Sequence, residues 1–181
     1  MGRWQGQANP PLSALGRAQA AGAAARLGTF DAVIASDLDR ALTTAMIIAE
    51  HIGVGPVLVD PAFRERHAGA FEGLTRAEID ERFPGHLDAG IWPAGWEHDD
   101  DVHDRVIEAL GRVVEQVRSG QVLVVSHGGV IYSLEGRLGA RYDRISNLGG
   151  RWFHYDGTTW RLGERVQLSP DDVTIENQDI V

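Results

Sequence analysis

Three residues suited to chemistry follow three short apolar runs. Arg40 follows residues 32–35, Glu65 follows residues 57–59, and His127 follows residues 122–125. An arginine and a histidine can stabilise charge on phosphoryl oxygens, and a carboxylic acid can protonate a leaving oxygen. The set indicates phosphoryl transfer, although none of the three is an evident nucleophile.

Each residue also has a simpler interpretation. Arg40 lies in the first turn of a predicted helix, where the helix dipole disfavours a cation, so we expect it to hold an anion. The alternative is a surface arginine paired with Asp37 or Asp39. Glu65 lies between two arginines and is a candidate proton donor, or else part of an exposed salt-bridge loop.

His127 precedes Gly128 and Gly129, which have no side chains to keep a ligand away from the backbone. A single histidine is more often structural than catalytic. Its position at a predicted strand end, before two glycines, favours a functional role.

Strands and helices alternate along the chain. Strands are predicted at the three apolar runs, and Asp156-Gly157 is a hairpin signal between two further strands. Helices are expected at residues 14–27, 38–52, 76–83, 102–118 and 129–138. This order predicts an α/β fold, a three-layer α/β/α arrangement with a mostly parallel sheet and a C-terminal hairpin. Ligands bind at the carboxyl ends of such strands, where the three candidate residues should meet.

Composition limits the function classes. The 181 residues suit a single domain, 1–181, with a polar tail from about Ser169. The absence of cysteine excludes disulfides and thiolate chemistry, and the net charge of −9 argues against nucleic-acid binding. No apolar run approaches the roughly 18 residues of a membrane span, and no signal sequence follows Met1, so we expect a cytoplasmic protein. A homodimer is compatible with these properties.

The segment from His98 to Asp104 is rich in potential metal ligands. A metal-dependent phosphoesterase is therefore an alternative. Acidic residues are expected at a helix N-terminus, and no second ligand cluster accompanies them. We therefore expect neither a metal nor a cofactor.

Five stretches, in order, resemble the phosphoglycerate-mutase-like branch of the histidine phosphatase superfamily. They are residues 2–6, 11–20, 36–45, 64–73 and 124–129, which include Gly-Arg-Trp-Gln-Gly, Ser-Asp-Leu-Asp-Arg-Ala, Arg-Glu-Arg-His-Ala-Gly and Val-Val-Ser-His-Gly-Gly. The resemblance implies a phosphatase that transfers the phosphoryl group to a histidine.

The resemblance also implies roles for individual residues. Arg40 would clamp the phosphate, Glu65 would be the acid and base, and His127 would be the second histidine of the pocket. Gln5 and Gly6 would help to line the site, and the backbone of Gly128 and Gly129 would face a small phosphorylated substrate.

One family element has no counterpart. Family members carry the nucleophilic histidine in an Arg-His-Gly motif at the end of a first, central strand, and none of the seven histidines here lies in such a motif. We expect that the first strand is missing through truncation or a misassigned start. The alternative is a non-catalytic relative that binds phosphorylated ligands.

The segment from Thr75 to Asp101 bears on the type of reaction. It is short and has neither lysine nor adjacent arginines, which favours a phosphatase over a phosphoglycerate mutase. Trp92, Trp96 and His98 in this segment are candidates for covering the pocket, or they simply pack the loop onto the core.

Overall fold

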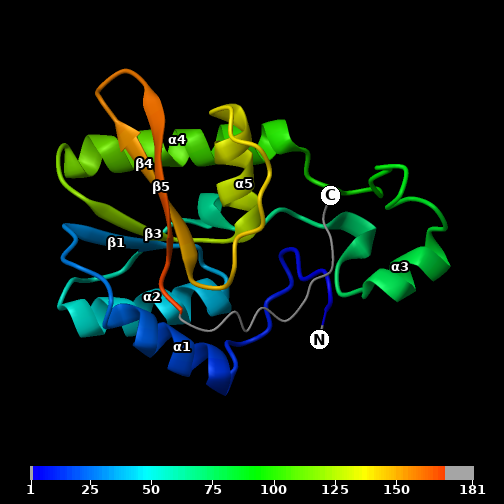
Figure 1. Cartoon of the computed structure of the whole chain (residues 1–181), viewed down its shortest axis with the longest axis horizontal. Coiled ribbons are helices and arrows are strands. Elements are labelled where there is room, and N and C mark those ends of the chain that lie inside the picture. The colour runs from blue at the N-terminus through cyan, green and yellow to red at the C-terminus, as the bar shows by residue number, and fades with distance from the viewer. Residues whose placement is uncertain (1, 170–181) are drawn as a thin grey trace.

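The computed structural model describes residues 2–169 and contains the predicted parallel sheet. Its strands are β1 (Ala32–Ala35), β2 (Leu58–Val59) and β3 (Val122–Val125), in the order β2-β1-β3. Both pairings are parallel, so the three carboxyl ends lie at one edge (Figure 1). The α/β class predicted from the alternation of elements is confirmed.

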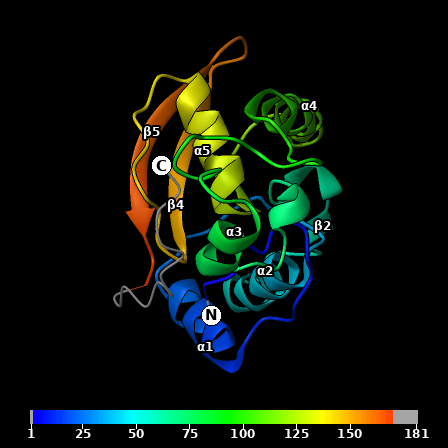
Figure 2. The ribbon, with the colours of Figure 1, turned by 90° about the vertical axis from the view of Figure 1, so that its right-hand side faces the viewer.

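Successive side chains of a strand point to opposite faces of the sheet, so each strand contributes to the cores on both faces. Ile34 and Val124 join one core cluster with α4 (Asp99–Val117) and α5 (Gly128–Arg137). Val33 and Leu123 join another with α2 (Asp39–Ile52). Figure 2 shows α2 beside α1 (Ala14–Ala24), apart from α4 and α5, so helices cover both faces of the sheet.

Most helix ends follow the predicted signals. Ser13 caps α1, and Thr75 forms a capping box with Glu78 at α3 (Arg76–Arg82). Gly53 ends α2 in the left-handed conformation, with φ 69°.

Three predicted boundaries were wrong. Helix α4 begins at Asp99 rather than Val102, because the acidic run forms its first turn, where negative charge is favoured. Helix α1 ends at Ala24, before Gly28. The N-cap of α2 is Leu38, and Ser36 accepts a hydrogen bond from the Leu38 N–H instead of capping the helix from the predicted position.

The predicted C-terminal hairpin consists of β4 (Gly149–Tyr155) and β5 (Trp160–Gln167), which form a separate antiparallel sheet. Asp156 accepts hydrogen bonds from Thr158 and Thr159 and closes the turn. Helix α5 is joined to the hairpin by an ion pair between Arg165 and the buried Glu135, with 2.6 Å between Nη2 and Oε2. Apart from Ser169 itself, the expected polar tail lies outside the described residues.

A cavity of about 2390 Å³ separates β3 from β4 and continues to the carboxyl ends of the strands. It is lined on one side by Val122 to Val125 and on the other by Gly149 to Tyr155. Within residues 2–169, no strand pairs with this edge of β3 or with the facing edge of β4. We call this part of the cavity the slot.

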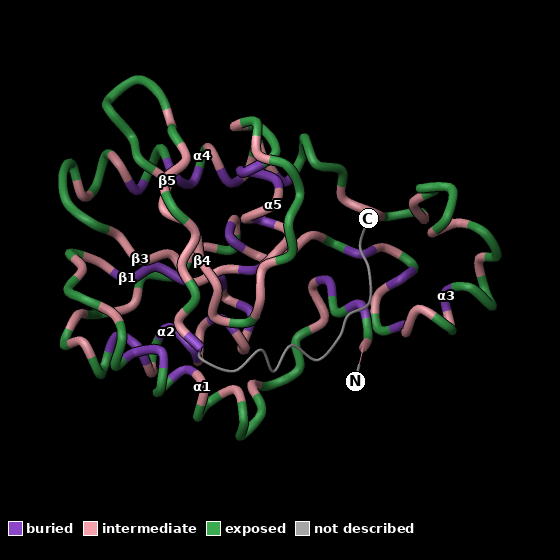
Figure 3. The backbone as a smooth tube through the Cα atoms, viewed as in Figure 1, coloured by how far each residue is buried: buried purple, intermediate pink, exposed green. Residues whose placement is uncertain are grey.

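The strand beside the slot is less buried than the central strand. Strand β1, paired on both sides, has three buried residues out of four, whereas none of the four apolar residues of β3 is fully buried. Figure 3 shows the same contrast along the chain. No helix among the described residues is long and apolar enough to cross a membrane.

Two short 3₁₀ helices, η1 (Pro61–Phe63) and η2 (Gly69–Phe71), enclose the loop that contains Glu65. This loop, residues 64–68, leads from the end of β2 toward α3 and is called the acid loop below. A hydrophobic cluster of Trp4, Phe71, Leu74 and Ile79 is buried in this part of the molecule.

Candidate active site

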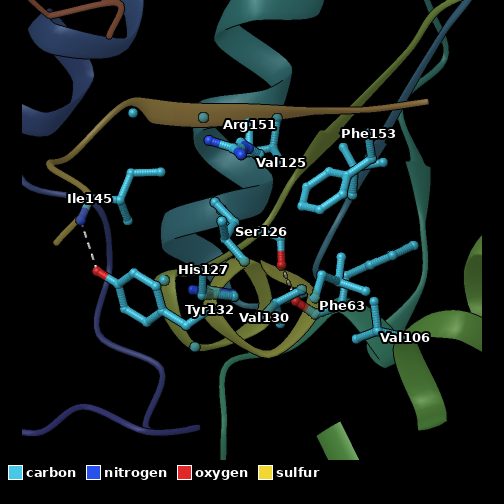
Figure 4. A pocket seen from close by; sticks show the side chains of 18 of the residues that line it. Phe63, Val106, Val125, Ser126, His127, Val130, Tyr132, Ile145, Arg151 and Phe153 are labelled. Carbon is cyan, nitrogen blue, oxygen red and sulfur yellow. Dashed lines mark hydrogen bonds between the residues drawn. The ribbon is translucent and has the colours of Figure 1, made fainter. Parts of the chain in front are cut away.

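Arg40, Glu65 and His127 all line the large cavity near the carboxyl ends of the three parallel strands. His127 immediately follows β3, Arg40 lies in the first turn of α2, and Glu65 lies in the acid loop after β2. The sheet topology thus brings the three residues to one edge. Figure 4 shows His127 and Ser126 at the end of β3, with Tyr132 and Val130 of α5 beside them.

His127 is 8% exposed, and its Nε2 lies 3.0 Å from Ser36 Oγ. Burial, together with the positive charges of Arg40 and Arg105, lowers the pKa of His127 to about 3. The ring is therefore neutral at physiological pH without a ligand. An anion bound beside it would add negative charge and shift the pKa of His127 upward.

Glu65 is held by backbone groups from two segments. The Arg66 N–H donates to Oε1 over 2.7 Å, and the Gly129 N–H donates to Oε2 over 3.3 Å. Desolvation by the surrounding protein raises the pKa of Glu65, although these hydrogen bonds and Arg40 act in the opposite direction. A raised pKa favours the protonated carboxyl group, which is the form that can donate a proton.

Gly129 is required for this arrangement. A Cβ at this position would lie 2.2 Å from Glu65 Oε1, far inside van der Waals contact. Its N–H donates to the Glu65 carboxylate. The resemblance implied that the backbone of Gly128 and Gly129 would face the substrate, and that role stays a prediction. Gly128 is also closely packed, since a Cβ there would lie 3.3 Å from the Tyr132 ring.

The guanidinium group of Arg40 donates to two carbonyls of the N-terminal loop, Ala8 over 2.8 Å and Gly6 over 2.8 Å. Asp37 is bound by Arg64 instead, and Asp39 accepts from the Leu12 N–H. The described contacts therefore do not include the surface pair considered from the sequence. Burial lowers the pKa of Arg40, but an arginine remains a cation.

Gly6 and Gln5 both line the cavity, but their environments differ. Gly6 has φ 51°, and a Cβ there would lie 2.6 Å from Glu72 Oε2, so the loop needs glycine at this position. Gln5 is exposed. Its neighbour Gln7 donates to the Glu65 carbonyl over 3.1 Å and thus joins the N-terminal loop to the acid loop.

Three contributors were missed from the sequence. Gln7 and Ser36 are described above, and the third is Arg105 of α4. Arg105 donates to the carbonyls of Ala62 and Arg64 over 2.6 and 2.9 Å and forms an ion pair with Glu97 at 2.6 Å. Ser36 had a local signal, which was interpreted as a helix cap. Arg105 had none, because the two carbonyls of the acid loop region that it binds lie about 40 residues away in the sequence.

The acidic segment at the start of α4 does not gather ligands for a metal. Within residues 2–169, no group of three or more histidine, cysteine, aspartate or glutamate side chains could hold an ion. His103 contacts its neighbour Asp104 at 3.3 Å, and Asp100 pairs with Arg137.

Comparison with known proteins identifies the family. Residues 1–164 match the family model of the histidine phosphatase superfamily (branch 1). The chain is a histidine phosphatase superfamily member. This agrees with the resemblance of the five sequence stretches.

Relatives of this histidine phosphatase family member include a phosphatase by name and a phosphoglycerate mutase-like protein. The glucosyl-3-phosphoglycerate phosphatase of Mycolicibacterium vanbaalenii is 37% identical, over 90% of this chain and 80% of that protein. The phosphoglycerate mutase-like protein 4 of Arabidopsis thaliana is 35% identical, over 87% of this chain and 75% of that protein.

Solved structures give the same result. A mycobacterial glucosyl-3-phosphoglycerate phosphatase in complex with VO3 is 33% identical and superposes with a TM-score of 0.77, covering 89% of each chain. Bacillus stearothermophilus YhfR superposes with a TM-score of 0.80 at 27% identity, over 94% of this chain and 90% of that one. The predicted phosphoglycerate-mutase-like fold is confirmed.

Proposed function

We propose that this histidine phosphatase family member hydrolyses the monoester of a small phosphorylated metabolite through a phosphohistidine intermediate. The observation that carries the proposal is the convergence of Arg40, Glu65 and His127 on one cavity at the carboxyl edge of the sheet. We further propose that residues 1–181 act as one domain, in the cytoplasm and without a nucleic-acid partner.

Each of the three residues has a role that its surroundings support. Arg40 binds the phosphoryl oxygens with the N–H groups that the carbonyls of Gly6 and Ala8 leave free. His127, once protonated beside the bound anion, stabilises the charge that develops in the transition state. Glu65 donates its proton to the leaving oxygen and afterwards accepts one from the attacking water.

The attacking nitrogen belongs, in this proposal, to a segment outside residues 1–181. Of the three histidines that line the cavity within residues 2–169, His98, His127 and His154, only His127 directly follows a strand of the parallel sheet, and its Nε2 already contacts Ser36. The slot supports the proposal, because β3 and β4 offer two unpaired edges to one further extended segment. A segment that ends in Arg-His-Gly at the His127 end would bring its histidine to the phosphate.

The stability of the fold gives a second reason to expect a further strand in the slot. An unpaired backbone group costs free energy when it is removed from water without a partner, and an exposed edge invites pairing with another chain. A strand in the slot would bury Val122 to Val125 and use the free edges of both sheets.

The experiment is a fusion in which an apolar strand, Arg-His-Gly and a flexible tether precede Met1. We expect the fusion to hydrolyse phosphomonoesters and to form an acid-labile phosphohistidine in a burst assay. The matched control has asparagine in place of the motif's histidine and should be inactive but equally stable. Turnover by the 181-residue chain alone, with phosphate on His127, would show that the assignment of the nucleophile is wrong.

Two alternatives are distinguished by the same proteins. A phosphoglycerate mutase would interconvert phosphoglycerates faster than it releases phosphate. A non-catalytic relative would bind phosphate or vanadate but remain inactive in both the fusion and the parent chain.

A further inference from the structure

Three tryptophans stand along the cavity beside the acid loop. Trp92 and Trp96 are stacked, with ring centroids 4.2 Å apart and an interplanar angle of 9°. Trp4 lies 5.7 Å from Trp96, and all three line the cavity. We call these residues the tryptophan wall.

Packing of the core does not account for the whole wall. Trp4 is 9% exposed and belongs to the buried hydrophobic cluster, whereas Trp92 and Trp96 pack against that cluster and remain partly exposed. Two indoles that line a cavity and keep some accessible surface offer apolar contact to a ligand.

The wall is fixed to the acid loop by backbone contacts. Trp96 forms a β-bridge with Ala68, and the Glu97 N–H donates to the His67 carbonyl over 3.0 Å. Gly69, with φ 55°, permits this approach, because a Cβ there would lie 2.5 Å from the Ala94 carbonyl oxygen. The backbone of Trp96 is therefore joined directly to the loop that contains Glu65.

Arg66 connects the wall directly to the proposed acid. Its N–H donates to Glu65 Oε1, and its guanidinium carbon lies 5.4 Å from the centre of the Trp96 ring. If Glu65 protonates the leaving oxygen, the organic part of the ester begins beside Glu65 and extends toward the wall.

We infer that the tryptophan wall is a subsite for the alcohol portion of the substrate and selects an alcohol that carries a ring. A ring with an apolar face, aromatic or glycosyl, can stack on an indole, whereas a short acyclic alcohol leaves the indole uncovered. This inference rests on the proposed function, because it takes Glu65 to face the leaving group.

The test uses the 181-residue chain and four ligands: phenyl phosphate, glucose 6-phosphate, ethyl phosphate and inorganic phosphate. The chain has five tryptophans, so titration can be followed by NMR through their indole N–H signals. We expect a ring-bearing ester to bind about five- to tenfold more tightly than ethyl phosphate, the usual worth of an aromatic contact. If the subsite accepts an aryl alcohol, only phenyl phosphate should bind more tightly than ethyl phosphate. If it accepts a sugar, glucose 6-phosphate should bind more tightly as well.

Variants separate the wall from the phosphate site. Trp92→Ala should reduce the affinity for the ring-bearing ester to that for ethyl phosphate and leave inorganic phosphate unchanged, while Trp92→Phe should keep most of the preference. The control is Ile91→Ala, since Ile91 is 52% exposed and does not line the cavity. Arg40→Gln should weaken the binding of all four ligands.

Equal affinity for the three esters would overturn the subsite and leave the phosphate site intact. An unchanged affinity in Arg40→Gln, with the ring preference retained, would overturn the phosphate site instead. A chain that binds none of the four ligands overturns both.

Discussion

At the scale of single residues, Gly129 allows the most direct test of the acid. Gly129→Ala would place a methyl group where Glu65 Oε1 now lies and displace the carboxylate. We expect at least a tenfold loss of alkyl phosphate hydrolysis in the fusion protein, because general acid catalysis contributes about 100-fold or more. Stability should also fall, by about 1–3 kcal/mol, because the displaced carboxylate is crowded and loses its backbone hydrogen bonds.

Gly136→Ala is the matched control for this substitution. Gly136 lies in the same helix, and no atom lies within 4 Å of an added Cβ. This variant should keep full activity and gain about 0.5–1 kcal/mol of stability. Equal activity of the two variants would contradict the close approach of Gly129 to Glu65.

His127 should make stability depend on pH. Its pKa in the folded protein is about 3, below the ordinary value of 6.5, so the unfolded chain binds a proton first as the pH falls. The free energy of unfolding should therefore decrease below about pH 6.5, by up to about 1.4 kcal/mol for each pH unit down to about pH 3.

Urea denaturation at pH 7 and pH 5 measures this effect. In His127→Asn, the difference in the free energy of unfolding between the two pH values should shrink by about 1–2 kcal/mol. Glu65 has a raised pKa and loses stability as the pH rises, so it cannot produce the same trend. An unchanged difference in His127→Asn would mean that the buried imidazole titrates normally.

At the scale of elements, the acid loop depends on α4 through Arg105. Arg105→Gln should destabilise the protein by about 2–3 kcal/mol, because it leaves Glu97 and two carbonyls without their charged donor in a largely buried position. Activity of the fusion should fall with it, since the loop contains Glu65. Urea denaturation and alkyl phosphate hydrolysis measure the two effects.

Arg112→Gln is the control on the same helix. Arg112 forms ion pairs with Asp60 and Glu108 but is 44% exposed, so its loss should cost at most about 1 kcal/mol. Similar losses in both variants would mean that Arg105 is an ordinary surface arginine.

Local sequence signals predicted most of the secondary structure, but they could not predict contacts between distant segments. Apolar runs and caps such as Ser13, Thr75 and Gly53 act within a few residues, so the strands, most helices and the three strand-end residues could be read from the sequence. Contacts of Arg105 with the acid loop, and of His127 with Ser36, join segments that only folding brings together. The proximity of Gly129 to Glu65 belongs to the same class.

At the scale of the whole molecule, the slot should be visible in hydrogen exchange. Backbone N–H groups of a strand alternate between its two edges, and one edge of β3 has no partner within residues 2–169. In the 181-residue chain, we expect some β3 amides to exchange at least about 100-fold faster than those of β1. The fusion should protect them, and equal rates in both proteins would contradict an occupied slot.

A strand that fills the slot between β3 and β4 could be a separate peptide or part of the same chain, and the two cases respond differently to dilution. If the histidine-bearing strand is a separate peptide, turnover becomes bimolecular and falls as either component is diluted. A covalent tether replaces this dependence by a fixed effective concentration, which is in the millimolar range for short flexible linkers. The same fold would then behave as a two-component switch or as a constitutive enzyme, according to whether that strand is covalently joined to the rest of the chain.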